Sequence, residues 1–248
     1  MCFLALRVEL GTLRRSEASW LRQVVSAGFD GVELAISAAA PDSPELLRQI
    51  ACTGRVLALA ARVVSRHPET ALKELSGLMR LAREIGAEWL NLSVPGGEGR
   101  LSAGSPAPCE AGLHLCHELL HQGRFEAERE GVAIGVEPGA GSPLTSPMEL
   151  RELIDDSPSW AIGACVDLHR VASFSAAKDW LETLGRRVFV IRVDVENYQS
   201  SGAVWLPAAL RAIGFEGLLI CRVSPDAAII EPALLHQVAG KWRAVLAG

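Results

Sequence analysis

The sequence predicts an α/β protein folded as a single (β/α)8 TIM barrel, and three observations lead to that prediction. The chain has 248 residues, which is a usual length for such a barrel. Short apolar runs alternate along the chain with amphipathic helical stretches, as in repeated β-α-β units. Most of the apolar runs show no polar alternation, as expected for parallel strands that are buried on both faces.

The apolar runs are the predicted strands of the barrel. They are rich in Val, Ile, Leu and Ala, and they cover residues 3–8, 31–34, 56–63, 89–93, 132–137, 162–167, 188–195 and 217–223. No internal boundary interrupts this series, so we predict one domain over residues 1–248.

Helices are predicted between the strands. Periodic apolar residues mark the clearest segments, which are 16–25, 70–85, 146–154, 207–213 and 232–246. Ser146 and Glu149 have the spacing of a capping box at a helix start. Gly86 and Gly214 stand where a helix usually ends at glycine.

Composition excludes several classes of protein. Hydrophobic residues make up 49% of the chain and charged residues 21%, which favours a folded domain over a disordered one. The net charge of -5 disfavours a nucleic-acid partner, and no apolar run has the length of a membrane span. The six cysteines lack a C-x-x-C spacing, so we expect reduced thiols in a cytoplasmic protein. The sequence does not decide whether the protein forms a homo-oligomer.

Six phrases in a fixed order carry a resemblance to a known family. Together they resemble the sugar-phosphate isomerase/epimerase group of the xylose-isomerase-like TIM barrel superfamily, over nearly the whole chain. They are AGFDGVEL (27–34), LAREIGAEWLNLSVPGG (81–97), EREGVAIGVEP (128–138), IGACVDLHR (162–170), RVFVIRVDVEN (187–197) and AIGFEGLLICRV (212–223).

The resemblance implies a divalent-metal site at the C-terminal mouth of the barrel. Its ligands are typically a Glu ending strand five, an Asp ending strand six, a His on strand seven and a Glu on strand eight. Glu137 and Asp167 match the first two positions. The third position holds Arg192, or Asp194 in a register shifted by two residues, and the fourth holds Arg222.

Two further positions depart from the family pattern. Strand four commonly supplies a His before its Pro-Gly, where this chain has Val94. The family often has a His three residues after the strand-six Asp; that place is Arg170 here, and His169 stands one residue earlier.

Arginine cannot replace a metal ligand, because its guanidinium offers donors only and stays protonated. We therefore predict a degenerate, metal-free mouth in which Arg192 and Arg222 pair with Glu137 and Asp167. If a metal is retained, Glu137 and Asp167 would hold Mn²⁺, Mg²⁺ or Zn²⁺ weakly.

The candidate catalytic residues are Glu137, Asp167 and His169. Burial would raise the pKa of Glu137 and neighbouring arginines would lower it, and the sequence does not decide between these effects. His169 shares a face with Asp167 if the strand continues, and it is then a candidate proton shuttle. The alternative is a loop histidine without a role.

Candidate substrate-binding residues surround these three. They are Glu33, Arg62, Arg192, Asp194 and Arg222, and Arg7 with Glu9 lies near them at the end of strand one. A ring of arginines suits a small anionic, sugar-like substrate with a phosphate or carboxylate. The equally weighted alternative is that the arginines only neutralise the nearby acids.

Three histidines, His114, His117 and His121, share one side of a predicted outer helix. Such spacing can bind zinc, but this helix lies away from the strand ends, so we favour a solvated surface.

Three functions compete. The first is an isomerase or epimerase of a sugar or sugar acid, which acts by proton transfer at the mouth. The second is a non-catalytic barrel that binds an anionic metabolite or a protein partner. The third and weakest is an apurinic-site endonuclease, whose many His and carboxylate metal ligands this chain lacks.

Overall fold

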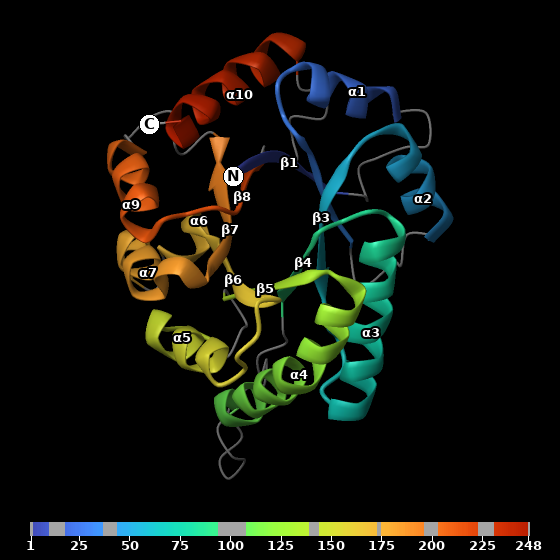
Figure 1. The fold of residues 1–248 in the computed structure, drawn as a ribbon, viewed down its shortest axis with the longest axis vertical. Helices are drawn as coiled ribbons and strands as arrows, with labels where there is room; N and C mark the ends of the chain where they lie inside the picture. The colour runs from blue at the N-terminus through green and yellow to red at the C-terminus, as the bar shows by residue number, and fades with distance from the viewer. Residues whose placement is uncertain are drawn as a thin grey trace.

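Eight parallel strands close into a barrel in this computed structural model, which describes residues 2–9, 18–36, 44–93, 108–138, 144–172, 175–195, 203–222 and 231–247. Each strand pairs with the next along the chain, and β8 pairs with β1 to close the ring. Figure 1 shows the strands at the centre with the helices around them, α10 lying beside α1 where the ring closes. The predicted TIM barrel is confirmed.

The strands lie where the sequence predicts them, to within one or two residues at each described end. They are β1 (Phe3–Glu9), β2 (Gly31–Ala35), β3 (Val56–Arg62), β4 (Trp89–Ser93), β5 (Ala133–Glu137), β6 (Ile162–Asp167), β7 (Val188–Asp194) and β8 (Leu218–Arg222).

The helices pack outside this barrel. They are α1 (Ala18–Ser26), α2 (Pro44–Thr53), α3 (Pro68–Glu84), α4 (Pro108–Glu130), α5 (Pro147–Asp155), α6 (Leu168–Val171), α7 (Ala177–Leu184), α9 (Leu206–Ile213) and α10 (Pro232–Ala247), with 3-10 turns η3 (Gly185–Arg187) and η4 (Ala203–Trp205). The five predicted helical segments correspond to α1, α3, α5, α9 and α10.

Local sequence signals place the helix ends. The hydroxyl of Ser146 accepts hydrogen bonds from the backbone N–H groups of Met148 and Glu149, and the Glu149 carboxylate accepts one from the N–H of Ser146. The predicted capping box is therefore present. Gly86 and Gly214 follow α3 and α9 with φ of 76° and 63°, a region that favours glycine.

Two apolar clusters form the core. The larger one fills the space between barrel and helices. The smaller one lies inside the barrel and includes Ala5, Ala58, Val190 and Ile220. Gly163 on β6 makes room there, since a Cβ at that position would lie only 2.4 Å from the Phe189 ring. Small residues on some strands thus admit large side chains from others.

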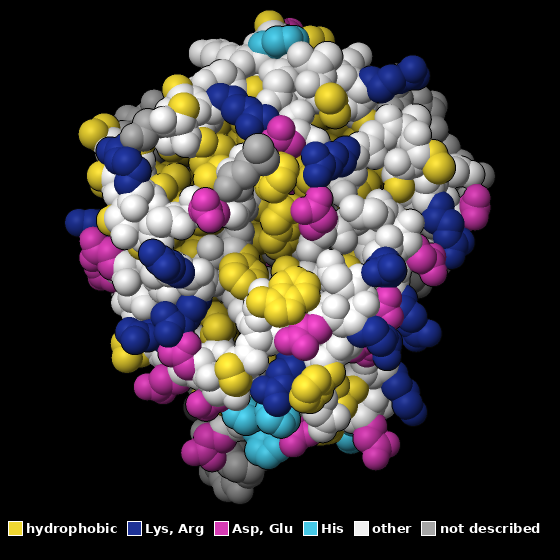
Figure 2. All heavy atoms as spheres, viewed as in Figure 1, with side chains coloured by type: hydrophobic (Ala, Val, Ile, Leu, Met, Phe, Trp, Pro, Cys, Tyr) yellow, Lys and Arg dark blue, Asp and Glu magenta, His cyan; other side chains and the backbone are white. Residues whose placement is uncertain are grey.

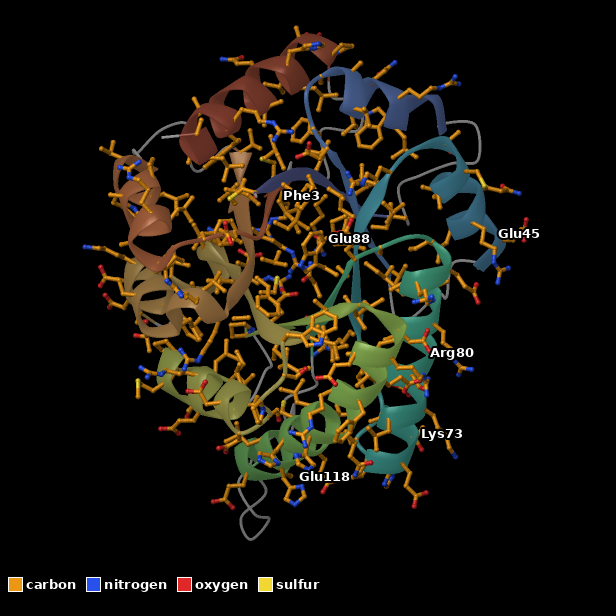
Figure 3. The ribbon with its side chains drawn as sticks, viewed as in Figure 1. Phe3, Glu45, Lys73, Arg80, Glu88 and Glu118 are labelled. Carbon is orange, nitrogen blue, oxygen red and sulfur yellow. The ribbon has the colours of Figure 1, made fainter. Side chains whose placement is uncertain are left out.

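The amino-terminal face of the barrel is hollowed. Figure 2 shows hydrophobic side chains in a central depression, and Figure 3 shows Phe3 and Glu88, at or just before the starts of β1 and β4, near its middle. The hollow has a volume of about 760 Å³, and its lining includes Trp89, Phe189 and Phe215. None of the predicted site residues lines it.

The described cysteine side chains are free thiols, as expected. Cys116, Cys165 and Cys221 are buried, and burial raises the pKa of Cys116 to about 12. Within the described ranges, every helix is too short or too polar to cross a lipid bilayer.

Candidate functional site

Charged side chains converge at the carboxyl-terminal ends of the strands. We call this group the mouth cluster, and its members are Arg7, Glu9, Glu33, Asn91, Ser93, Glu137, Asp167, Arg170, Arg192, Asp194 and Arg222. Strand register brings many of them together as direct neighbours: Arg7 with Glu33, Ser93 with Glu137, Asp167 with Arg192, and Asp194 with Arg222.

An ion pair between Arg192 of β7 and Glu33 of β2 lies deepest in this cluster. The Arg192 Nη2 is 2.6 Å from Glu33 Oε1, and its Nε is 3.1 Å from Oε2. The Arg192 and Glu33 side chains are 2% and 0% exposed. Loss of one partner from such a buried pair typically costs about 3–5 kcal/mol, because the other charge stays buried.

Glu33 has two further partners. Its Oε2 accepts a hydrogen bond from Arg7 Nη1 at 2.9 Å, and its Oε1 accepts one from Asn91 Nδ2 at 2.6 Å. Burial alone would raise the pKa of Glu33, but Arg192 and Arg7 together lower it to about 2. Glu33 is therefore a fixed anion at neutral pH. Glu33 thus lies within the mouth cluster.

Glu137, the candidate base, is held by three donors. Arg192 Nη1 lies 2.5 Å from its Oε2, Arg170 Nη1 lies 2.7 Å from its Oε1, and the Ser93 hydroxyl donates to Oε2 at 3.2 Å. Burial favours a higher pKa of Glu137, but Arg192 and Arg170 outweigh it and lower the pKa. The sequence leaves open whether burial or the arginines determine the pKa of Glu137; in the structure the arginines have the larger effect.

The two arginines on Glu137 differ in how firmly they are held. Arg192 is buried, whereas the Arg170 side chain is 43% exposed and extends from the four-residue helix α6. Ion pairs with a solvent-exposed partner contribute only ~0–1 kcal/mol. The Arg170 contact is therefore the weaker and more easily replaced of the two.

Asp167 ends β6 and caps the helix that follows. Its Oδ1 accepts the backbone N–H groups of His169 and Arg170, each at 3.2 Å, and this turns the chain into α6. The strand therefore does not continue past Asp167. His169 is exposed on α6 and does not share a strand face with Asp167, because the longer strand that this arrangement requires is not present.

Arg222 of β8 joins two acids. Its Nη1 lies 2.9 Å from Asp167 Oδ2, while its Nε and Nη2 lie 3.0 Å and 2.9 Å from the two oxygens of Asp194. The hydrogen bond with Asp194 raises the pKa of Arg222. The predicted pairs Arg222–Asp167 and Arg192–Glu137 both form. Asp194 follows Arg192 by two residues and lies on the same inward face of β7. Both alternatives for the strand-seven position therefore belong to the cluster.

Arg62 ends β3 at the edge of the cluster. Its Cα partner is Ser93, whose hydroxyl reaches Glu137, while the neighbouring Ala61 and Val63 pack in the outer core. Alternation along the strand therefore directs Arg62 to the mouth. Its side chain is exposed, and no residue in the described ranges forms an ion pair with it.

The described residues of the mouth do not fit a divalent metal ion. The carboxylates of Glu137 and Asp167 face Arg170, Arg192 and Arg222, and guanidinium nitrogens cannot be ligands. Among the described residues, no three His, Cys, Asp or Glu side chains are grouped so as to hold a metal. Val94, where the family has its strand-four His, lies outside those residues.

The histidines of α4 form a solvent-facing row. His114, His117 and His121 are exposed, the rings of His117 and His121 stack at 6.2 Å, and His117 Nε2 lies 3.7 Å from Asp156, the residue that follows α5. Within the described part of the chain, these histidines do not belong to a group of side chains that could hold a metal ion.

Several members of the cluster are not predicted from the sequence as site residues. Asn91 and Ser93 look like ordinary polar residues of β4, and Arg170 is noted only as a departure from the family pattern. A usable signal exists for Arg170, since it follows the cap Asp167 by three residues, which places both on one side of a helical turn.

Comparison with known proteins identifies the family. The sequence model of the family described as "Xylose isomerase-like TIM barrel" matches residues 21–239. The chain belongs to this family. A search of curated proteins gave no match.

Solved structures of the xylose isomerase-like fold are similar over the full barrel. An L-ribulose 3-epimerase superposes with a TM-score of 0.74 at 18% identity, covering 100% of this chain and 95% of that one. The 3-keto-D-glucoside 4-epimerase YcjR from E. coli gives 0.72 at 15% identity, covering 100% of both chains. The IOLI protein, solved with a bound zinc atom, gives 0.68 at 16% identity and covers 98% of both chains. At these identities the likeness establishes a fold that sugar epimerases also have.

Proposed function

We propose that the protein binds a small anionic sugar or sugar acid at the mouth cluster and isomerises or epimerises it by proton transfer without a metal ion. The observation that carries the proposal is that Arg170, Arg192 and Arg222 contact the carboxylate oxygens that a metal would need. The positive charge that stabilises a developing enediolate then comes from the chain itself. Solved structures named as sugar epimerases share the fold, which supports the substrate class.

Glu137 is the proposed base. It would take a proton from the carbon next to the substrate carbonyl, leaving an enediolate beside the guanidinium groups of Arg170 and Arg222. Return of a proton to the same carbon from the opposite face gives an epimer. Return to the neighbouring carbon, with a proton passed from one enediolate oxygen to the other, gives an isomer. Asp167 or His169 would supply the second acid or base. The substrate, or the residues that contact it, would be positioned by Arg192, Arg62, Glu33 and Asp194.

Hydrogen exchange tests the proton transfer directly. The protein is incubated in D₂O with ketoses, aldoses, sugar acids and sugar phosphates, with EDTA or with Mn²⁺, and deuterium uptake beside the carbonyl is followed by NMR. We expect uptake in EDTA that falls about 100-fold or more in Glu137→Gln, because general bases contribute at least that much. Glu45→Gln on the surface of α2 is the control. Uptake that requires Mn²⁺ contradicts the metal-free proposal.

A second candidate is a barrel that binds an anionic metabolite without converting it. It is favoured by the lowered pKa of Glu137, which makes this carboxylate a weak base as long as Arg192 and Arg170 both contact it. Under this alternative, sugar acids or phosphates raise the melting temperature but no deuterium enters them. Such a pair of results would replace the first proposal with the second.

A further inference from the structure

The lowered pKa of Glu137 conflicts with its proposed work as a base, and the geometry of the cluster suggests how the conflict is resolved. Of its three donors, Arg192 is buried between Glu33 and Glu137, and Ser93 is neutral. Arg170 is the one charged donor that solvent reaches readily, with 43% of its side chain exposed. An anion in solvent can therefore reach this guanidinium.

We infer that Arg170 is an exchangeable partner of Glu137, which the negatively charged group of the substrate takes over on binding. The guanidinium contacts Glu137 through Nη1 at 2.7 Å and lies 3.7 Å from Asp167 through Nε, so it meets each of these two carboxylates through a single nitrogen. A carboxylate or phosphate on the ligand offers it a bidentate alternative. Glu137 then loses one of its two positive neighbours and becomes a stronger base only when substrate is present.

Arg62 supplies a second cation for the same anion. Its strand position is in register with Ser93, and Ser93 is in register with Glu137. Arg62 at the end of β3 and Arg170 just after β6 therefore flank the end of β5 that carries Glu137. The other arginines are less suited to receive a ligand. The Nε, Nη1 and Nη2 atoms of Arg222 all donate to Asp167 or Asp194. Arg7 donates to Glu9 and Glu33.

Binding of an anion at Arg170 deepens the proposed function. Only the subsequent action of Glu137 as a base rests on that function. Such binding identifies the substrate class as one with a carboxylate or phosphate group, and it assigns Arg170 as a specificity-determining residue. Binding of an anion at Arg170 and Arg62 does not require that the protein be an enzyme.

The test measures binding of inorganic phosphate by calorimetry at constant ionic strength, since salt screens such contacts. Arg170→Gln and Arg62→Gln should each weaken phosphate binding about tenfold, as loss of one charge-assisted hydrogen bond typically does. Arg170→Lys should retain most of the binding. Arg151→Gln on α5 is a matched control, because Arg151 is also 43% exposed and pairs with Asp155 at 3.7 Å.

Glu137→Gln gives the sharper result. It removes the internal competitor for Arg170, so phosphate should bind several-fold more tightly than to the unaltered protein, with Arg170→Gln cancelling that gain. A purely structural contact predicts weaker binding instead. Thermal melting confirms that each variant is folded; should Glu137→Gln not fold, the comparison of Arg170→Gln with Arg170→Lys decides.

The outcomes separate this inference from the proposed function. Phosphate binding that is unaffected by Arg170→Gln and Arg62→Gln overturns the inference, even if deuterium exchange shows an active enzyme. Binding that depends on Arg170 without any exchange supports the inference and removes the catalytic proposal. Absence of phosphate binding to the unaltered protein also overturns the inference.

Discussion

Glu33 is a carboxylate without exposed surface, and its neighbours determine that it stays charged. Arg192, Arg7 and Asn91 all donate to it, so its pKa is about 2 although burial opposes ionisation. The same arrangement leaves Asn91 Oδ1 buried without a hydrogen-bond partner among the described residues. The cluster thus favours the charge of Glu33 over complete satisfaction of Asn91.

Glu33 makes the free energy of unfolding depend on pH in the acid range. Its folded pKa of about 2 lies below the unfolded value of 4.5, so the stabilisation is present above pH 4.5 and is lost as the pH falls toward 2. The shift corresponds to about 3 kcal/mol. We expect urea unfolding of Glu33→Gln to show a smaller loss of stability between pH 4.5 and 2 than the unaltered protein, and Glu45→Gln is the surface control. An unchanged slope in Glu33→Gln would show that Glu33 is not the group responsible.

Sequence reasoning placed eight of the eleven residues of the cluster, and it missed the contact that lies deepest. Glu137, Asp167, Arg192 and Arg222 are among those found, because each lies at or near the end of a recognisable strand. The pairing of Arg192 with Glu33 is not found, since these residues are 159 positions apart and meet only when the barrel closes. Strand patterns specify which face a residue occupies, but they do not specify contacts across the barrel.

Helix α5 shows how fully an element can be predicted from local chemistry. Its start is read correctly from Ser146 and Glu149, because a capping box needs only residues near in sequence. Helix α6 shows the opposite. Its start depends on Asp167, which also ends β6. The sequence predicts a strand that ends at this residue, but it does not predict a helix after it.

The Ser146 cap should contribute measurably to stability. Ser146→Ala removes the acceptor for the N–H groups of Met148 and Glu149, and loss of such a cap typically costs about 1 kcal/mol. Chemical denaturation measures the difference. Ser26→Ala is the control, since the Ser26 hydroxyl only donates to the Gln23 carbonyl near the end of α1. Equal effects of the two changes would contradict the capping role.

Across the whole molecule, barrel closure determines what the mouth can do. The order of the eight strands was predictable, because the spacing of apolar runs and helices leaves few alternative topologies. The register of strand seven was left open by two residues. The balance of charge inside the mouth was predictable only in outline, as arginines opposing carboxylates. The loops above it, including Val94 and Glu196, fall outside the described residues.

The ion pair between Glu33 of β2 and Arg192 of β7 should stabilise the whole barrel. Arg192→Met leaves Glu33 buried beside Arg7 and Asn91, and we expect a loss of about 3–5 kcal/mol in the free energy of unfolding. Addition of Glu33→Gln should recover a large part of that loss, because the uncompensated charge is removed. Denaturant titration of the single and double variants measures both. A double variant as unstable as the sum of the two single changes would contradict this account.

The bond between Arg192 and Glu33 also bears on whether half of this barrel can exist alone. A break in the chain between β4 and β5 would place Glu33 on one fragment and Arg192 on the other, each directed toward the open inner surface of its sheet. Each half would then carry a buried charge that has lost one ion-pair partner to the other half, since Glu33 would keep Arg7 and Arg192 would keep Glu137. Two such fragments would be matched to each other, so reassembly from separated halves would favour the native partner over a second copy of the same half.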